Sequence, residues 1–205
     1  MPDFFHEKRL GGLVAGVDEV GRGPLAGPVV AAAVILDRRR LPRALAGLDD
    51  SKALCAEARV EYAIVLRRVA RIGIGAASVA EIDAINILQA SMLAMRRAVA
   101  ALGVVPDVAL VDGNRGPALD CRVETLIGGD ALSFSIAAAS VIAKVTRDRA
   151  MASLGLRHDR YGWERNAGYP TPEHRAAIAL HGITPHHRRS FAPVREWLLG
   201  REAAE

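Results

Sequence analysis

The sequence predicts an α/β protein built on a sheet of mixed strand direction. Three observations support this class: strand-like apolar runs come first, a helical pattern follows, and strand-like and helical segments then alternate. The chain has 205 residues, of which 51% are hydrophobic and 24% are charged. A chain of this length and hydrophobic content can bury a core without disulfides or structural metals.

The first half of the chain contains three strand-like segments and one helical segment. Residues 13–20 form a short apolar run that stops at the turn cluster Gly21-Arg22-Gly23-Pro24. Residues 28–36 are rich in β-branched residues and alanine, and we expect them to pair with the first run as a hairpin. Residues 56–71 have a helical pattern, and residues 72–77 are a candidate third strand.

A capping box predicts where a long helix begins. Ser78 fits the N-cap and Glu81 the third helical position, so that each side chain can satisfy a backbone N–H of the first turn. Gly103 and Pro106 predict the end of this helix. One apolar face at steps of three and four residues is formed by Ile85, Leu88, Met92, Met95 and Val99.

The second half alternates strands and helices before its composition changes. Residues 108–111 and 121–127 are candidate strands, and residues 133–153 are a candidate helix. Beyond residue 156 the chain is rich in Arg, His, Pro and Gly, with a further helix predicted from Pro172 to His181.

This change in composition also divides the chain. We expect a core at residues 1–155 and a C-terminal helical extension at residues 156–205. The segment from Arg157 to Arg195 has seven arginines and only three acidic residues, an excess equal to the net charge of +4 of the whole chain. A basic segment beside an acidic site is what a nuclease needs. The alternative is a solvated charged tail.

No segment indicates export or membrane insertion. The first ten residues are polar, and the longest apolar run, residues 24–36, is shorter than the ~20 residues of a membrane span. Cys55 and Cys121 form no C-x-x-C motif, so neither a disulfide framework nor a cysteine-based zinc site is expected. We expect a cytoplasmic protein with reduced thiols, no membrane association and, by default, a monomer.

Acidic residues occur at three places where strands end or loops begin, each beside glycine. Asp18-Glu19 lies near the end of the first strand, Asp112 ends another, and Asp130 follows two glycines. Four clustered carboxylates would repel one another, and such hard ligands favour Mg²⁺ or Mn²⁺ over zinc. The alternative is that these are ordinary turn and capping residues. Adjacent strand residues also point to opposite faces, so either the strand distorts or Glu19 reaches the site differently from Asp18.

Two further groups are candidates for contacts with nucleic acid. The glycines of Gly21-Arg22-Gly23 allow close backbone approach to a ligand such as the 2′-hydroxyl of RNA, or they form only a tight turn. Ser140, Lys144 and Asp148 share one face of the later helix at i, i+4 and i+8. Lys144 is a candidate phosphate contact, and Asp148 either orients it or lies behind the metal site. An ordinary surface pair is the alternative.

Several short motifs then occur in a characteristic order. The first and most specific is Gly16-Val17-Asp18-Glu19-Val20-Gly21-Arg22-Gly23-Pro24-Leu25-Ala26-Gly27-Pro28. The later ones are Asp50-Ser51-Lys52, Val111-Asp112-Gly113, Gly129-Asp130, Ala143-Lys144-Val145, Arg147-Asp148, Gly168-Tyr169 and His187-Arg188-Arg189-Ser190-Phe191. Together they resemble the motifs of the type 2 ribonucleases H, over nearly the whole chain. Only about a dozen residues precede the first strand, which argues against the related type 3 enzymes and their N-terminal substrate-binding domain.

The resemblance implies a ribonuclease H-like fold, with a five-stranded mixed sheet flanked by helices and a C-terminal helical extension. It implies metal binding and catalysis by Asp18, Glu19, Asp112 and Asp130. It further implies that the loop Gly21, Arg22 and Gly23 senses the ribose 2′-hydroxyl.

The resemblance also implies contacts with substrate outside that loop. Tyr169 matches a tyrosine that packs against the nucleotide following the ribonucleotide. Lys52 and Lys144 are matched less specifically as contacts to the substrate backbone. The residues expected to support the site are Ser140, Arg147 and Asp148.

The implied activity is hydrolysis within RNA–DNA hybrids and on the 5′ side of a ribonucleotide embedded in duplex DNA. Water activated by divalent metal would leave a 3′-hydroxyl and a 5′-phosphate. The alternatives are another metal-dependent nuclease of the same superfold acting on DNA, and a catalytically silent nucleic-acid-binding module. Five histidines in the C-terminal segment lack the spacing of a zinc site, so we expect them to pack or to contact phosphate.

Overall fold

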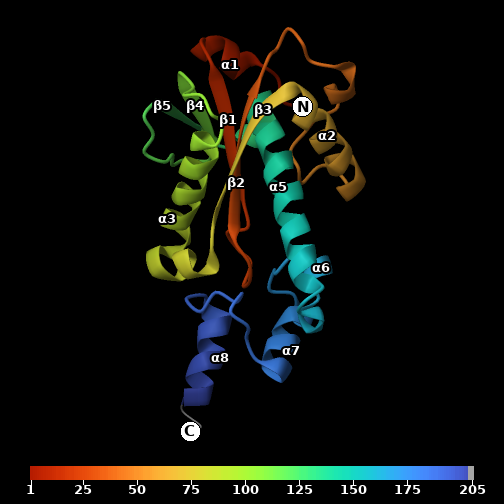
Figure 1. Cartoon of the computed structure of the whole chain (residues 1–205), viewed down its shortest axis with the longest axis vertical. Helices are drawn as coiled ribbons and strands as arrows, with labels where there is room; N and C mark the ends of the chain where they lie inside the picture. The colour runs from red at the N-terminus through yellow and green to blue at the C-terminus, as the bar shows by residue number, and fades with distance from the viewer. Residues whose placement is uncertain (203–205) are drawn as a thin grey trace.

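Five strands form one sheet in the order β3-β2-β1-β4-β5 (Figure 1). The computed structural model describes residues 1–202, with side chains through residue 200. β1 (Val14–Val20), β2 (Val29–Leu36) and β3 (Ala70–Ala77) are successively antiparallel, whereas β4 (Val108–Asp112) and β5 (Arg122–Leu126) continue the sheet parallel to β1. The predictions of a mixed sheet and of a hairpin between the first two strands are confirmed.

Helices cover both faces of this sheet. α3 (Val79–Ala100) packs on one face, and α2 (Ala56–Val69) and α5 (Phe134–Gly155) pack on the other. Alternation along β1 sends odd-numbered side chains such as Val17 toward α3. Even-numbered positions face α5, and at Gly16 a Cβ would lie only 2.2 Å from the backbone carbon of Ser135. The helix that flanks the acidic end of β1 therefore lies directly on that strand.

The long helix α3 differs from its prediction at one point. Its capping box is present, with Ser78 Oγ accepting from the Glu81 N–H and Glu81 accepting from the Ser78 N–H. However, Asn86 has φ 65° and ψ 164°, so that the element consists of two helices joined at a kink. The predicted apolar face is therefore wrong at Ile85, which is 38% exposed. The buried residues of α3 are Ile82, Ala90, Ser91, Ala94, Met95, Ala98 and Val99.

The chain beyond α5 forms a helical extension at one end of the sheet (Figure 1). It contains α6 (Trp163–Asn166), α7 (Pro172–His181) and α8 (Ala192–Glu202), with a short 3-10 turn, η2 (Asp159–Tyr161). Its apolar residues share one cluster with Leu25 and Ala26 of the loop after β1 and with Met151 of α5. The extension therefore packs against the loop that follows the acidic strand.

Outside the extension, three short elements had no signal in the sequence. They are α1 (Phe5–Leu10), the 3-10 turn η1 (Arg43–Leu45) and α4 (Gly129–Leu132), which carries Asp130. Glu7 of α1 shows why, because its Oε1 accepts hydrogen bonds from the Ser133 hydroxyl and the Ser135 N–H, more than 120 positions later. Such contacts between distant residues cannot be detected from local sequence patterns.

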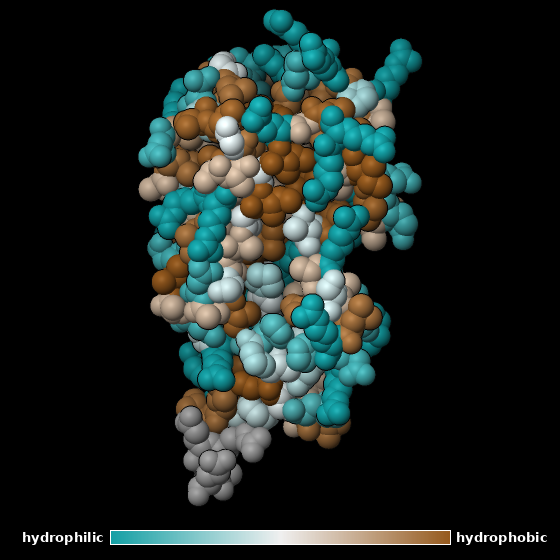
Figure 2. Space-filling model, in the orientation of Figure 1, coloured by the Kyte–Doolittle hydropathy of each residue, from teal (hydrophilic) through white to brown (hydrophobic). Residues whose placement is uncertain are grey.

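The surface combines hydrophilic side chains with a band of hydrophobic residues. Figure 2 shows this band over the upper half of the molecule, where β3 forms the edge of the sheet in Figure 1. Among the described helices, none has the length and apolar character needed to cross a membrane. Cys55 and Cys121 are both free thiols.

Candidate active site

The acidic residues lie at one end of three neighbouring segments of the fold. Asp18 and Glu19 are near the end of β1, and Asp112 is the last residue of β4. These strands are parallel, with Val17 paired to Val111, so their carboxyl ends meet at the same edge. Asp130 lies in α4, just after β5. The topology therefore brings together residues that are more than 100 positions apart.

β1 stays regular through both of its acidic residues. Asp18 pairs with Ala32 and Glu19 with Ala31 in the antiparallel register. Asp18 is 6% exposed and interacts with Ser140 of α5, whereas Glu19 lines a hollow beside α3. The two carboxylates therefore approach from opposite faces, and Asp112 at the strand end interacts electrostatically with both.

Burial and mutual repulsion shift the protonation of these carboxyl groups. Burial raises the pKa of Asp18 well above its ordinary value, and the charges of Glu19 and Asp112 raise it further. Burial also raises the pKa of Glu19, against the opposing charge of Arg22. The pKa of Asp112 is raised by burial and by the charge of Asp130. The four carboxylates therefore form one continuous set of interacting charges.

Hydrogen bonds and two cations hold the set in place. Asp112 Oδ1 accepts from the Gly129 N–H at 2.7 Å. Lys52 Nζ donates to Asp130 Oδ2 at 2.6 Å, and this contact raises the pKa of Lys52 although partial burial opposes it. Arg22 donates to Glu19 Oε1 at 3.3 Å. In this arrangement, no three His, Cys, Asp or Glu side chains among residues 1–202 form a metal-binding group.

The loop between β1 and β2 is fixed by a buried arginine of the extension. Arg188 is fully buried and donates to three carbonyl oxygens, those of Gly21 (2.6 Å), Arg22 (2.9 Å) and Gly27 (2.8 and 3.0 Å). Burial, together with the nearby charge of Arg147, lowers the pKa of Arg188 to about 9. The sequence motifs include Arg188, but its burial and its role had no local signal.

Arg147 of α5 supports the same loop from the other side. It is also fully buried and donates to the carbonyls of Ala26, Pro28 and Ala167 at 2.9–3.1 Å. Gly21 has φ 95°, and a Cβ there would lie 2.1 Å from Arg147 Nε. Only glycine fits at that position. Arg147 supports the loop and has no exposed surface with which to contact a substrate.

Tyr169 lies at the junction of this loop and the extension. Its side chain is partly exposed, and a Cβ built on Gly23 would be 3.7 Å from Tyr169 Cε1. The aromatic ring and the glycine loop therefore border the same surface. The backbone carbonyl of Tyr169 accepts a hydrogen bond from His174 Nδ1 at 2.9 Å.

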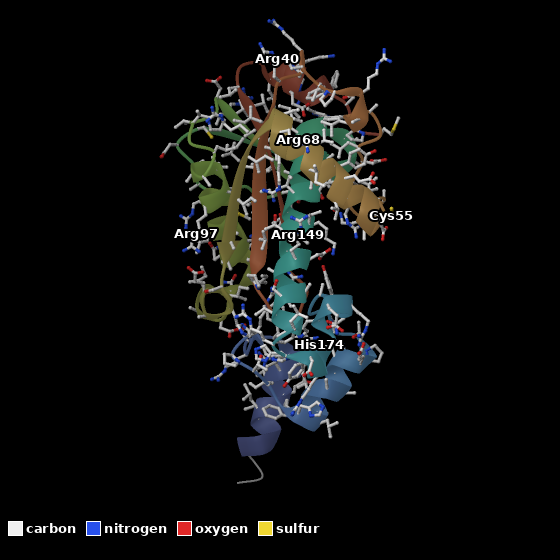
Figure 3. All side chains as sticks on the ribbon, turned by 45° about the vertical axis from the view of Figure 1, so that its right-hand side comes forward. Arg40, Cys55, Arg68, Arg97, Arg149 and His174 are labelled. Carbon is white, nitrogen blue, oxygen red and sulfur yellow. The ribbon has the colours of Figure 1, made fainter. Side chains whose placement is uncertain are left out.

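A chain of hydrogen bonds through His174 and His187 determines which ring nitrogen of each histidine carries its proton. The Trp163 Nε1–H donates to His174 Nε2 at 3.1 Å, which leaves His174 Nδ1 as the protonated nitrogen. The Thr184 N–H donates to His187 Nδ1, so His187 Nε2 donates to His174 Nε2 at 3.1 Å. Burial, with the neighbouring His174, lowers the pKa of His187 to about 3. Both histidines are neutral packing residues inside the extension, where Figure 3 shows His174.

The remaining predicted residues lie on α5 or contact it. Ser140 hydrogen-bonds Ser51 at 2.8 Å and interacts with Asp18, which places both serines beside the carboxylates. Lys144 and Asp148 form an ion pair at 2.7 Å farther along the helix. This ion pair is compatible with Asp148 orienting Lys144 and with an ordinary surface pair.

Comparisons with known proteins identify the family. The sequence profile of the family described as ribonuclease HII matches residues 15–194. Ribonuclease HII from Granulibacter bethesdensis is 62% identical over 207 residues, covering all of this chain and 94% of the relative.

Solved structures have the same fold. The ribonuclease H2 from Pyrococcus horikoshii OT3 superposes with a TM-score of 0.75 at 28% identity, covering 92% of this chain and 98% of that one. A structure described as Bst-RNase HIII in complex with Mn²⁺ shares the fold at 20% identity, with a TM-score of 0.73 and coverage of 99% and 75%. This chain is therefore a member of the ribonuclease HII family, the hydrolases that cut RNA in RNA–DNA hybrids.

Proposed function

We propose that Asp18, Glu19, Asp112 and Asp130 form the catalytic centre and bind Mg²⁺ or Mn²⁺. The observation that supports this proposal is the set of interacting charges around the end of β4, where repulsion adds to burial in raising pKa values. Carboxylate oxygens are the hard donors that these ions prefer. When bound, such ions activate water and stabilise the leaving oxygen in phosphodiester hydrolysis.

Two cations of the chain supply positive charge that a divalent ion would otherwise provide. Lys52 contacts Asp130 and Arg22 contacts Glu19, and the side chains of the two cations are 78% and 52% exposed. Exposed side chains of this length move easily away from their partners. We expect metal binding to release both cations, and Lys52 then to contact a phosphate of the substrate.

The chain holds the other two carboxylates more firmly. Asp18 Oδ1 accepts from the Glu19 N–H at 2.8 Å, and the Ser140 hydroxyl hydrogen-bonds the same carboxylate. Asp112 is fixed by the Gly129 N–H. Asp18 and Asp112 therefore provide preorganised acceptors, while Glu19 and Asp130 adjust when an ion enters.

The loop Gly21-Arg22-Gly23 is proposed to recognise the ribose 2′-hydroxyl. Arg188 donates to the carbonyls of Gly21 and Arg22, and Arg147 donates to those of Ala26 and Pro28 just beyond, so the backbone is rigid before substrate arrives. A rigid polar backbone can distinguish a hydroxyl that both donates and accepts hydrogen bonds from a hydrogen atom. Tyr169 borders the loop and is proposed to pack on the next nucleotide, on the 3′ side of the ribonucleotide.

The substrate proposed is therefore a single ribonucleotide in duplex DNA as well as a longer hybrid. Cleavage occurs on the 5′ side of the ribonucleotide and leaves a 3′-hydroxyl and a 5′-phosphate. The core of residues 1–155 carries the carboxylates, and the extension of residues 156–205 contributes to substrate binding through Tyr169. Lys144 contacts the substrate backbone, with Asp148 as its orienting partner. We propose a monomeric cytoplasmic enzyme.

A cleavage assay on matched duplexes tests this proposal. Duplexes that are all DNA, that contain one ribonucleotide, or that pair RNA with DNA are incubated with enzyme and Mg²⁺ or Mn²⁺. We expect cleavage of the last two only, and no cleavage by Asp18→Asn, which should still bind. Glu124→Gln on β5 removes one carboxylate outside the site and is the matched control.

The rival functions give different results in the same assay. Equal cleavage of the all-DNA duplex would favour a nuclease that acts on DNA. Binding with strong salt dependence but no cleavage with either ion would favour a silent binding module. Gly23→Ala refines the test, since its new methyl group makes only ordinary contact with Tyr169 and should reduce ribonucleotide selection without loss of folding.

A further inference from the structure

A groove leads from the carboxylates along α3. It consists of three adjoining hollows of about 310, 260 and 390 Å³ that share their lining residues. The first is lined by Glu19 and Asp112 and shares Met92 and Arg115 with the second. The second shares Arg96 with the third, which ends beside the loop 103–106 and Cys121. Together the three hollows form an elongated groove rather than one closed small-molecule pocket, a shape that suits an extended strand.

The groove runs away from the extension. The carboxylates lie at the carboxyl ends of β1 and β4, next to the loop against which the extension packs. The far end of the groove lies beside Pro106 and Cys121, which precede β4 and β5. Because β1, β4 and β5 are parallel, this far end is at the opposite end of the sheet from Tyr169.

The lining suits one strand of nucleic acid. Arg115 and Arg96 are exposed, and neither forms an ion pair within the described residues. The neighbouring Arg97, by contrast, pairs with Glu81 at 2.7 Å. Between the two free arginines lie the apolar side chains of Leu88 and Met92. Beyond the carboxylates themselves, the acidic lining residue is Asp120 at the far end.

We infer that this groove binds the 5′-flanking segment of the strand that is cut, with Arg115 and Arg96 contacting its phosphates. The inference rests on the proposed function, in which Tyr169 holds the nucleotide on the 3′ side of the ribonucleotide. A strand that passes from Tyr169 over the carboxylates continues with its 5′ flank into the groove. Continuity with the site and the unpaired positive charge both favour this occupant.

Binding measurements on trimmed duplexes test the inference. Wild type, the double variant Arg96→Ala/Arg115→Ala and Arg68→Ala are titrated, without divalent ions, with duplexes containing one ribonucleotide. Arg68 is the matched control, an exposed arginine on α2 on the other side of the sheet (Figure 3). One duplex is complete, one lacks the 5′ flank of the cut strand, and one lacks the complementary strand opposite that flank.

The inference predicts a defined pattern of salt dependence. With the complete duplex, the double variant binds more weakly, and the slope of log affinity against log salt concentration decreases in magnitude by about two. This difference disappears when the 5′ flank of the cut strand is removed, and Arg68→Ala behaves as wild type throughout.

Two results would overturn the inference. One is equal binding of the complete duplex by wild type and the double variant. The other is a difference that disappears only when the complementary strand is trimmed, which would assign the groove to that strand. Cleavage rates on the complete duplex, at enzyme concentrations that saturate it, are measured in parallel with Mg²⁺. Equal rates show that the double variant is folded, whereas no cleavage by either enzyme would contradict the proposed function itself.

Discussion

Two regions beside the loop between β1 and β2 contain buried charge, but only one of them provides each charge with hydrogen-bonding partners. Arg147 and Arg188 are fully buried, and each donates to three carbonyl oxygens of the chain. Asp18 and Asp112 are partly or wholly removed from water beside two further carboxylates, and within the described part of the chain two exposed cations, Arg22 and Lys52, form ion pairs with this set. The arginines have their hydrogen-bonding partners within the chain, whereas the carboxylates lack sufficient positive charge.

This difference separates structural support from function. A buried charge with a full set of partners fixes the backbone around it. A cluster of like charges costs stability, so it persists where a ligand of opposite charge belongs. Changing one region should therefore affect folding, and changing the other should affect cleavage.

Asp18→Asn should have the largest effect, and on activity alone. We expect cleavage to fall by roughly a thousandfold or more, equivalent to about 4 kcal/mol of activation free energy. The free energy of unfolding should stay the same or rise slightly, because one repelling charge is removed and an oxygen acceptor remains. Urea unfolding and single-turnover cleavage measure the two quantities. A large loss of stability would show that the Asp18 carboxylate is a structural group.

Arg188→Met should have the opposite effect. The substitution leaves the carbonyls of Gly21, Arg22 and Gly27 without this buried donor, and we expect a loss of about 3–5 kcal/mol in the free energy of unfolding. Urea unfolding in the absence of substrate measures it. Arg189→Met changes the same charge on the exposed neighbouring residue and is the control. Equal stability of the two variants would contradict the supporting role of Arg188.

Gly21→Ala tests the tight fit between the loop and Arg147. The new Cβ would collide with the guanidinium in a backbone conformation that disfavours alanine, so we expect a loss of about 2–3 kcal/mol. Gly113 has nearly the same φ, 94°, with no atom within 4 Å of its Cβ position. Gly113→Ala should therefore cost only about 1 kcal/mol. Thermal unfolding of both variants separates steric collision from backbone strain, and equal losses would exclude the collision.

Acid should weaken the extension through its buried histidines. The folded pKa of His187 is about 3, below the usual value of about 6.5, so below pH 6.5 the unfolded chain takes up a proton that the folded chain excludes. Stability is therefore complete above pH 6.5 and decreases on acidification, by about 2 kcal/mol between pH 6.5 and pH 5. His187→Gln should reduce this slope in urea titrations across that range. An unchanged slope would show that His187 is protonated when folded.

Local patterns predicted most of the fold. β-Branched and alanine-rich runs indicated β1 and β2, and the capping box at Ser78 indicated the start of α3. The kink at Asn86 was not predicted, because an asparagine at positive φ inside an apolar pattern has no distinctive spacing. The short helices α1 and α4 were missed because contacts from distant parts of the chain stabilise them.

The candidate site was likewise predicted in part. The position of acidic residues at strand ends predicted that their carboxylates cluster, and they do so because parallel strands bring their carboxyl ends together. The basic excess of the extension was a weaker guide. Arg188 is fully buried, and Arg165 pairs with Glu164 and Glu173. These two arginines therefore do not contribute to the expected basic surface. A sequence shows a positive charge, but only the packed structure shows whether that charge faces solvent.

The most direct measurement is calorimetric titration of Mn²⁺ into the free protein. It needs no substrate, and it compares wild type with Asp18→Asn, Asp112→Asn and the control Glu124→Gln. If the carboxylates form one divalent-ion site, wild type and the control bind with equal affinity, and both Asp→Asn variants bind at least about tenfold more weakly. Equal Mn²⁺ binding by all four proteins would contradict the assignment of these carboxylates as the metal site.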